Sequence, residues 1–505
     1  MRRGRAAAAG PPPGGTPDPG ERPLRASAVR GVLYQGVSFI GGKVLVLLAT
    51  AVLARVLTPQ EFGLVALALV VIAIVDVVGD GGTAQALVYL PASKRRTDAA
   101  LATALAFAGA LTLLAVLLAP LLAGFFNTPA VTPLLRVLSL SLLLGACASV
   151  PEALLRKDLL FHKTVTASLL KAGVTGGLSI ALALSGAGVW ALVWGQLGGL
   201  VVYNIALWSL VDHRPDLRFW RLSWQDSAPL VRYGLSVSGA MLLSKAIFDV
   251  DYIIVGRMLG SEALGLYTLA FRLPELAIIS VFFVISAVAF PVYSRAHDDP
   301  ARLRRGYLSA LRLQSAYGAA AGAGLAVLAP YVVLAVFGPQ WRESTVPLTA
   351  LALYAAARAL GAGANDVYKA LGRPGLALGL SLVRLVLLVP VLVWATRWGI
   401  EGVAWAQLAM AVVFVFLMQG LAARVMGTPV RAVVAALLPA LVVGLGVAVG
   451  TGLVRWAVGD ATWPGLVLGL PAGALGALVA LRLGQPAFLR EVRGLLLRRT
   501  RAGAR

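Results

Sequence analysis

Long apolar runs dominate this chain and restrict it to a membrane fold. Of its 505 residues, 59% are apolar and only 13% are charged, whereas a soluble domain carries about a quarter charged residues. Lipid offers no hydrogen-bond partner to backbone N–H and C=O groups, so apolar runs of this length must be helical. The sequence therefore predicts an all-α integral membrane protein.

Fourteen transmembrane helices are predicted. They lie at about 31–54, 63–89, 99–123, 132–154, 164–185, 188–210, 234–257, 264–291, 307–335, 346–370, 375–396, 401–423, 431–453 and 464–482. The basic ends 1–30 and 484–505 read as cytoplasmic tails, the first of them disordered and without a signal-peptide core. The longest connection, 211–233, mixes aromatic and charged residues and predicts a cytoplasmic amphipathic linker.

The chain also repeats itself at a spacing of 202 residues. Lys43 recurs as Lys245, and later matches pair Arg55-Val56-Leu57 with Arg257-Met258-Leu259 and Phe62-Gly63-Leu64 with Leu264-Gly265-Leu266. We predict an N-lobe over 31–210 and a C-lobe over 234–425, each of six helices, with two extra helices over 426–483. An even number per lobe gives both the same orientation around a central cavity. Such repeats are typical of transporters with a site between them.

Basic residues predict the orientation. If the N-terminus is cytoplasmic, the cytoplasmic segments carry 31 of the 44 Lys and Arg residues, the outer loops carry five, and the rest lie in spans. This bias places both termini in the cytoplasm. It also accounts for most of the net charge of +22, so no nucleic-acid partner is needed; contact with anionic membrane lipids suffices.

Two strings near the start carry a family resemblance. The stretch 54–64, Ala-Arg-Val-Leu-Thr-Pro-Gln-Glu-Phe-Gly-Leu, is followed by Asp-Gly-Gly-Thr-Ala at 80–84. They resemble the opening of bacterial polysaccharide transporters, the Wzx and WzxC-like branch of the multidrug/oligosaccharidyl-lipid/polysaccharide exporter superfamily. The second copy, 260–266, lacks the proline, as expected of a diverged repeat.

The resemblance implies a function. Such a protein would be a flippase that moves a polyprenyl-diphosphate-linked oligosaccharide across the cytoplasmic membrane by alternating access, for cell-surface polysaccharide biosynthesis. Its partners would include a polysaccharide polymerase and glycosyltransferases. Two alternatives in the same superfamily stay open: a flippase for the peptidoglycan precursor lipid, and a multidrug exporter.

Charges inside the predicted spans are the candidate site residues, because a charge at that depth is costly. We expect Lys43, Lys245 and Arg272 to bind the diphosphate. The structural alternative is ion pairing, for example of Lys43 with Asp76 and of Lys245 with Asp249.

The acidic residues have two open interpretations, a coupling-ion site and charge balance. The candidates are Asp76, Asp80, Asp249, Asp251 and Glu275. Other charged or polar residues within or near the spans receive no role: Arg136, Lys171, Arg312, Arg358, Asn365, Asp366 and Arg384.

An enzyme is not expected. Asp249-Val-Asp251 matches a glycosyltransferase metal motif, but residues i and i+2 of a helix point about 200° apart and cannot share one cation. The single cysteine, Cys147, forms no disulfide within the chain, and the three histidines lack ligand spacing. We therefore expect no metal and no cofactor.

Overall fold

The computed structural model describes residues 41–79, 81–89, 93–158, 160–216, 224–296 and 298–490. Within these ranges every regular element is helical, which confirms the all-α class. Among the described residues, eleven helical stretches are long and apolar enough to cross a membrane. Two of them, Lys245–Ser286 and Pro374–Val425, also contain a break in the helix, at Gly260 and at Thr396–Trp398.

The helices follow one another with short connections. Those of the first half are α2 Pro59–Gly79, α3 Thr83–Tyr89, α4 Lys94–Phe125, α5 Val131–Leu138, α6 Leu140–Lys157, α7 Phe161–Leu184 and α8 Trp190–Leu210. Residues 41–56, which precede them, are helical as well.

The second half begins with α9 Trp224–Pro274, the π-helical turn η2 Glu275–Ile279, α10 Ser280–Arg295 and α11 Pro300–Val332. It continues with η3 Val333–Phe337, η4 Pro339–Ser344, α12 Thr345–Ala370, α13 Pro374–Ala395, η5 Thr396–Trp398, α14 Gly399–Val425, α15 Val430–Val458 and α16 Thr462–Gly484.

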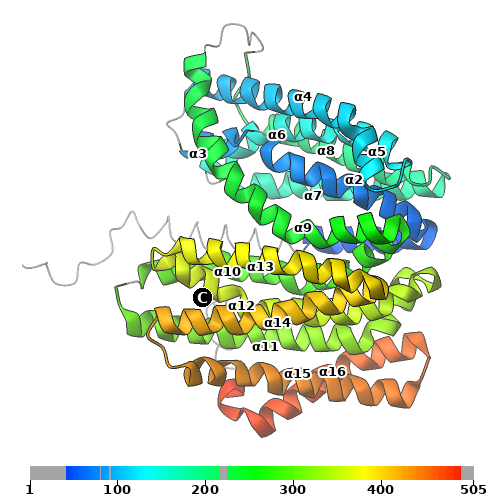
Figure 1. Cartoon of the computed structure of the whole chain (residues 1–505), viewed down its shortest axis with the longest axis vertical. Helices are drawn as coiled ribbons and strands as arrows, with labels where there is room; N and C mark the ends of the chain where they lie inside the picture. The colour runs from blue at the N-terminus through cyan, green and yellow to red at the C-terminus, as the bar shows by residue number, and fades with distance from the viewer. Residues whose placement is uncertain are drawn as a thin grey trace, which may run out of the picture.

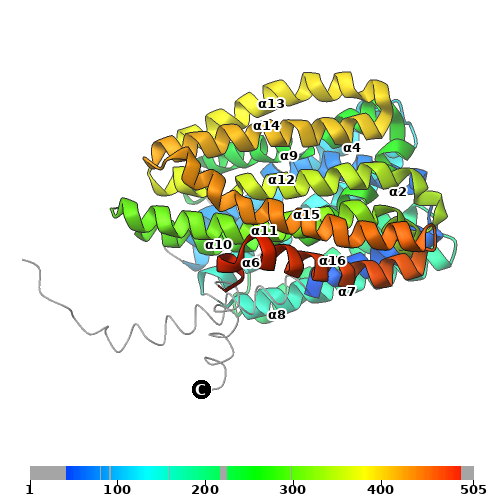
Figure 2. The same cartoon turned by 90° about the horizontal axis from the view of Figure 1, so that it is seen from below.

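The helices gather into two bundles (Figures 1 and 2). The first bundle contains 41–56 and α2 to α8, and the second contains α10 to α14. Helix α9 lies between them and contacts α2, α3 and α4 as well as α12, α13 and α14. Helices α15 and α16 pack on each other and on α11, at the side of the second bundle away from the first.

The predicted span 63–89 is broken in the structure. Helix α2 ends at Gly79 and α3 begins at Thr83, with Gly81 and Gly82 between them at φ of 59° and 69°. Glycine adopts this left-handed region without steric cost. A side chain at Gly82 would also collide with the backbone of Gly234 on α9, so the turn needs glycine for close approach as well.

The non-helical connection between the halves is shorter than the predicted linker 211–233, because α9 begins at Trp224. Residues 211–216 are not helical, but 224–233 already form the start of α9. The predicted tail 1–30, most of the tail 484–505 and the aromatic pair Phe219 and Trp220 lie outside the described residues.

Candidate functional site

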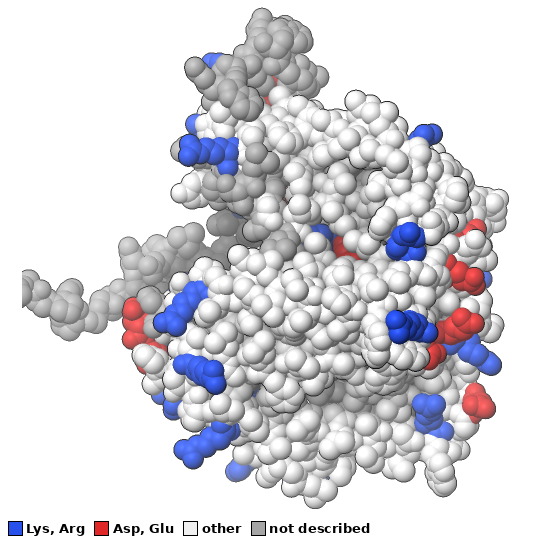
Figure 3. Space-filling view, in the orientation of Figure 1, with Lys and Arg blue, Asp and Glu red and all other residues white. Residues whose placement is uncertain are grey.

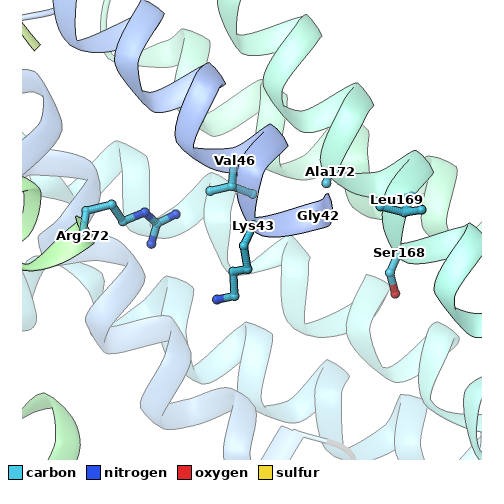
Figure 4. A pocket seen from close by; sticks show the side chains of 7 residues that line it. All are labelled: Gly42, Lys43, Val46, Ser168, Leu169, Ala172 and Arg272. Carbon is cyan, nitrogen blue, oxygen red and sulfur yellow. The ribbon is translucent and has the colours of Figure 1, made fainter. Parts of the chain in front are cut away.

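Two of the three predicted diphosphate ligands line one cavity of about 250 Å³. Lys43 comes from the helical residues 41–56, and Arg272 comes from the last turn of α9, 229 positions later in the chain. The rest of the wall comes from α7, with Ser168, Leu169 and Ala172. Figure 4 shows the Lys43 side chain between Arg272 and these α7 residues. Both halves of the chain therefore contribute a cation to this cavity.

The Glu275 carboxylate interacts electrostatically with both cations. Arg272 Nη1 lies 3.6 Å from Glu275 Oε2, and both side chains remain about one-third exposed. Lys43 is attracted electrostatically by Glu275 and repelled by Arg272. These three side chains together carry one excess positive charge. Basic and acidic atoms are visible in the cleft between the two bundles in Figure 3.

Lys245 is placed differently from the other two. It does not line this cavity, and its Nζ lies 2.7 Å from Asp249 Oδ2, one helical turn further along α9. The ion pair that we considered as the structural alternative is thus present for this lysine. A role of Lys245 in diphosphate binding stays a prediction.

The neighbouring carboxylate Asp251 points elsewhere. It is 3% exposed, and its Oδ2 accepts a hydrogen bond of 2.8 Å from the Tyr267 hydroxyl. Asp249 and Asp251 therefore have different partners, as the helical geometry requires. Among the described residues no group of three His, Cys, Asp or Glu side chains could hold a metal ion.

The remaining acidic candidates are less informative. Asp76 is exposed and interacts electrostatically with Lys171 of α7. Lys171 also lies over the Tyr203 ring, with 5.3 Å from Nζ to the centroid, and the Tyr203 hydroxyl donates to Glu152 at 3.1 Å. Asp80 lies outside the described residues.

Residues that received no role from the sequence form a second cavity. It measures about 290 Å³, and its polar lining is Ser286, Arg358, Asn365, Asp366, Lys369 and Arg384. The only signal in the sequence was a lone arginine in each of two apolar spans, which shows depth in the membrane but not the direction of the side chain.

The bundles meet at the end that holds Arg55, which we call the Arg55 end. Arg55 donates to the carbonyl oxygens of Ala335 and Val336 in η3. In return, Gln340 and Trp341 of η4 donate to the Ala54 carbonyl at 2.6 Å and 2.7 Å. These contacts close the molecule at this end. Lys43 lies twelve residues before Arg55, about 18 Å along a helix.

The repeated motif forms the centre of this contact. In the first copy, Thr58 and Glu61 cap α2 reciprocally: the Thr58 N–H donates to Glu61 Oε2 at 2.8 Å, and the Glu61 N–H donates to Thr58 Oγ1 at 3.3 Å. A Cβ on Gly63 would overlap the Ser261 carbonyl, and one on Gly265 would overlap the Pro59 carbonyl. The two motif copies therefore pack directly against each other.

The motif and fold have counterparts in known proteins. A family model described as polysaccharide biosynthesis protein matches residues 52–346, more than half of the chain. The chain belongs to this family. This membership confirms the resemblance to bacterial polysaccharide transporters that the first motif indicated. The matched range includes both motif copies, Arg55 and Arg272.

Individual relatives agree with this assignment. The succinoglycan biosynthesis transport protein ExoT of Rhizobium meliloti (strain 1021) is 28% identical over 332 residues, which cover 65% of this chain and 66% of ExoT. The lipopolysaccharide biosynthesis protein WzxC of Escherichia coli (strain K12) is 25% identical over 380 residues, 73% of this chain and 75% of WzxC. The match to ExoT thus spans just under two thirds of that relative.

A solved structure has the same fold. The lipid II flippase MurJ in an inward closed conformation superposes with a TM-score of 0.70 at 13% identity, over 91% of this chain and 99% of MurJ. At that identity the likeness concerns the fold alone. The chain is thus a multi-pass membrane protein with the fold seen in MurJ.

Proposed function

We propose that this protein is a flippase for a polyprenyl-diphosphate-linked oligosaccharide used in cell-surface polysaccharide biosynthesis. The observation that carries the proposal is the cavity shared by Lys43 and Arg272, which draws one cation from each half of the chain. Charge-assisted hydrogen bonds from ammonium and guanidinium groups are the strongest that proteins offer a phosphate. The family and its relatives ExoT and WzxC connect the chain with polysaccharide biosynthesis.

Alternating access accounts for the placement of the cavity. The Arg55 end is closed by hydrogen bonds between the bundles. The cavity lies further into the molecule, since Lys43 is about 18 Å from Arg55 along the helix. Transport requires the bundles to part at the Arg55 end and to meet at the other. The polyprenyl chain stays in lipid while the diphosphate and sugars pass between the bundles. A substrate drives this change only if it binds one state better than the other.

The protein operates in the cytoplasmic membrane with both termini in the cytoplasm. The bias of 31 basic residues against five supports this orientation. The Arg55 end then faces outward, and the structure represents a state closed to the outside. A reporter enzyme that is active only outside the cytoplasm, fused after residue 460, would test the orientation.

Transport needs no covalent chemistry by the protein. Lipid II also carries a diphosphate, so a cationic cavity alone does not separate the two lipid substrates; the family match favours the polysaccharide precursor. A multidrug exporter for cationic compounds is disfavoured because Lys43, Arg272 and Glu275 together carry a net positive charge.

The test is flipping in proteoliposomes. A fluorescent polyprenyl-diphosphate oligosaccharide should cross in wild type, and Lys43→Ala or Arg272→Ala should slow it about tenfold to a hundredfold. Such a loss corresponds to the 1.5–3 kcal/mol of a hydrogen bond to a charged group. Lys43→Arg should retain most of the rate.

The matched control is Arg482→Ala, which removes an exposed cation from the end of α16. It should leave the rate unchanged. Full activity in a Lys43→Ala/Arg272→Ala double variant would refute the diphosphate site, and flipping of lipid II alone would reassign the substrate.

A further inference from the structure

The second cavity lies between α9 and the second bundle and has both apolar and polar lining. Its wall comes from α9, η2, α10, α12, α13 and α14. Arg358 and Arg384 are its two guanidinium groups, on the neighbouring helices α12 and α13. Both side chains are only partly exposed.

A single hydroxyl draws the two arginines together. Arg358 Nη1 donates to the Tyr354 hydroxyl oxygen at 3.0 Å, and Arg384 Nη2 donates to the same oxygen at 3.3 Å. Arg358 also lies 4.4 Å from the Phe248 ring centroid. Two like charges that share one neutral acceptor repel each other and leave most of their donors unused. The Nε of Arg384 is buried with no hydrogen-bond partner in the described structure.

The acidic residue of the pocket is already committed to other partners. Asp366 accepts a hydrogen bond from Ser286 and interacts electrostatically with Lys369, three residues along α12. In the part of the chain that the structure describes, no carboxylate lies within 4.0 Å of either Arg358 or Arg384. The arginine pair therefore offers paired donors and excess positive charge to an anion from outside the protein.

The pocket is also suited to a sugar ring. The apolar surface comes from Phe248, Phe282 and Phe414, and Asn365 offers an amide for sugar hydroxyls. Pockets that combine apolar walls with a few convergent polar groups are the usual form of small-ligand sites. The Asn365 Oδ1 atom has no partner within the described residues.

The pocket adjoins the cationic cavity through shared helices. Ile279 of the pocket lies seven residues beyond Arg272 of the cationic cavity. Phe271, next to Arg272, packs on Tyr354 with ring centroids 5.9 Å apart. This part of α9 therefore contributes Arg272 to the diphosphate cavity and Phe271 to a contact with Tyr354, whose hydroxyl both arginines contact.

We propose that Arg358 and Arg384 bind the carboxylate of an acidic sugar in the transported oligosaccharide. The planar guanidinium fork matches a carboxylate in a bidentate arrangement. This proposal rests on the proposed flippase function and deepens it: the diphosphate is recognised at Lys43 and Arg272, and the arginine pair selects lipid-linked glycans that carry a uronic acid.

The experiment compares three fluorescent lipids in proteoliposomes. One carries a glycan with a hexuronic acid, the second carries the matching neutral hexose, and the third is the polyprenyl diphosphate without sugar. Wild type should flip the acidic lipid about tenfold faster than the neutral one. Arg358→Gln and Arg384→Gln should each abolish this preference while the neutral lipid still crosses. Lys43→Ala should slow all three lipids alike.

Several outcomes overturn the proposal. Equal flipping of acidic and neutral lipids by wild type would do so. The proposal also fails if the Gln variants slow the lipid without sugar as much as the acidic lipid, because Arg358 and Arg384 would then bind the diphosphate. Arg358→Lys and Arg384→Lys guard against misfolding, because they keep the charge and should keep part of the preference.

A binding measurement separates this proposal from the proposed function. Calorimetry on the purified protein with the free acidic and neutral oligosaccharides needs no flipping. If wild type flips no lipid but still binds the acidic glycan more tightly, and Arg384→Gln loses that preference, the flippase function fails and the arginine site stands. Equal binding of both glycans overturns the site.

Discussion

At the scale of single residues, equivalent positions in the repeat have taken different partners. Lys43 shares Glu275 with Arg272 at the cavity, whereas Lys245 pairs directly with Asp249. Lys43 lines the cavity together with Arg272, whereas Lys245 does not line it and has the Asp249 carboxylate at 2.7 Å. The two lysines should therefore contribute unequally to transport.

The Lys245–Asp249 pair can be dissected by a double-mutant cycle. Lys245→Ala leaves the partly buried Asp249 without its partner and should lower stability by about 1–3 kcal/mol, the cost of an unsatisfied buried group. Adding Asp249→Asn should restore most of that stability. The measurement is thermal unfolding together with flipping rate.

If Lys245 also binds diphosphate, the stable double variant should still flip slowly. Restoration of both stability and transport would show that the lysine acts only through its ion pair.

At the scale of elements, the family motif has two physical tasks. Its Thr-Pro-x-Glu part caps α2, and its glycine allows the backbone of α9 to approach. The cap is readable from sequence because it is local. The approach of Gly63 to Ser261 and of Gly265 to Pro59 joins segments about two hundred residues apart, and the sequence did not predict it.

Gly63→Ala should push the two motif copies apart. The added methyl would overlap the Ser261 carbonyl, and overpacking of this kind costs about 1–3 kcal/mol. We expect the population open at the Arg55 end to rise by about tenfold. Spin labels on Ser185→Cys and Arg397→Cys, in a Cys147→Ser background, measure this population. Molecules open at the Arg55 end should show a longer distance between the two labels.

The matched control is Gly379→Ala in α13, where a methyl meets nothing within 4 Å. It should leave the distance distribution unchanged. An unaltered distribution in Gly63→Ala would mean that α2 and α9 do not separate during transport.

At the scale of the whole molecule, transport depends on how strongly the bundles hold together at the Arg55 end. The contact there combines the backbone packing of the two motif copies with polar bonds and an edge-on ring pair, Phe62 with Trp341, whose centroids are 5.3 Å apart.

Trp341→Phe should loosen this end without removing the ring. It deletes the indole N–H bond to the Ala54 carbonyl, and a neutral hydrogen bond contributes about 1 kcal/mol, or about fivefold in population. The spin-label pair defined above should report more of the open state. Trp398→Phe, an exposed tryptophan near the same end, serves as the control; an equal shift in both variants would contradict a specific role of the Trp341 bond.

The sequence alone determined the membrane class, the helical order and the repeat. These follow from local hydropathy and from self-similarity, which need no knowledge of packing.

Only the tertiary structure decided which charges share a site. A helix that is apolar on all sides carries little periodic signal, so its sequence does not show which face a lone charge occupies. Packing sets that rotation. It brings Arg272 to Lys43, turns Lys245 to Asp249, and points Arg358 and Arg384 at one tyrosine hydroxyl.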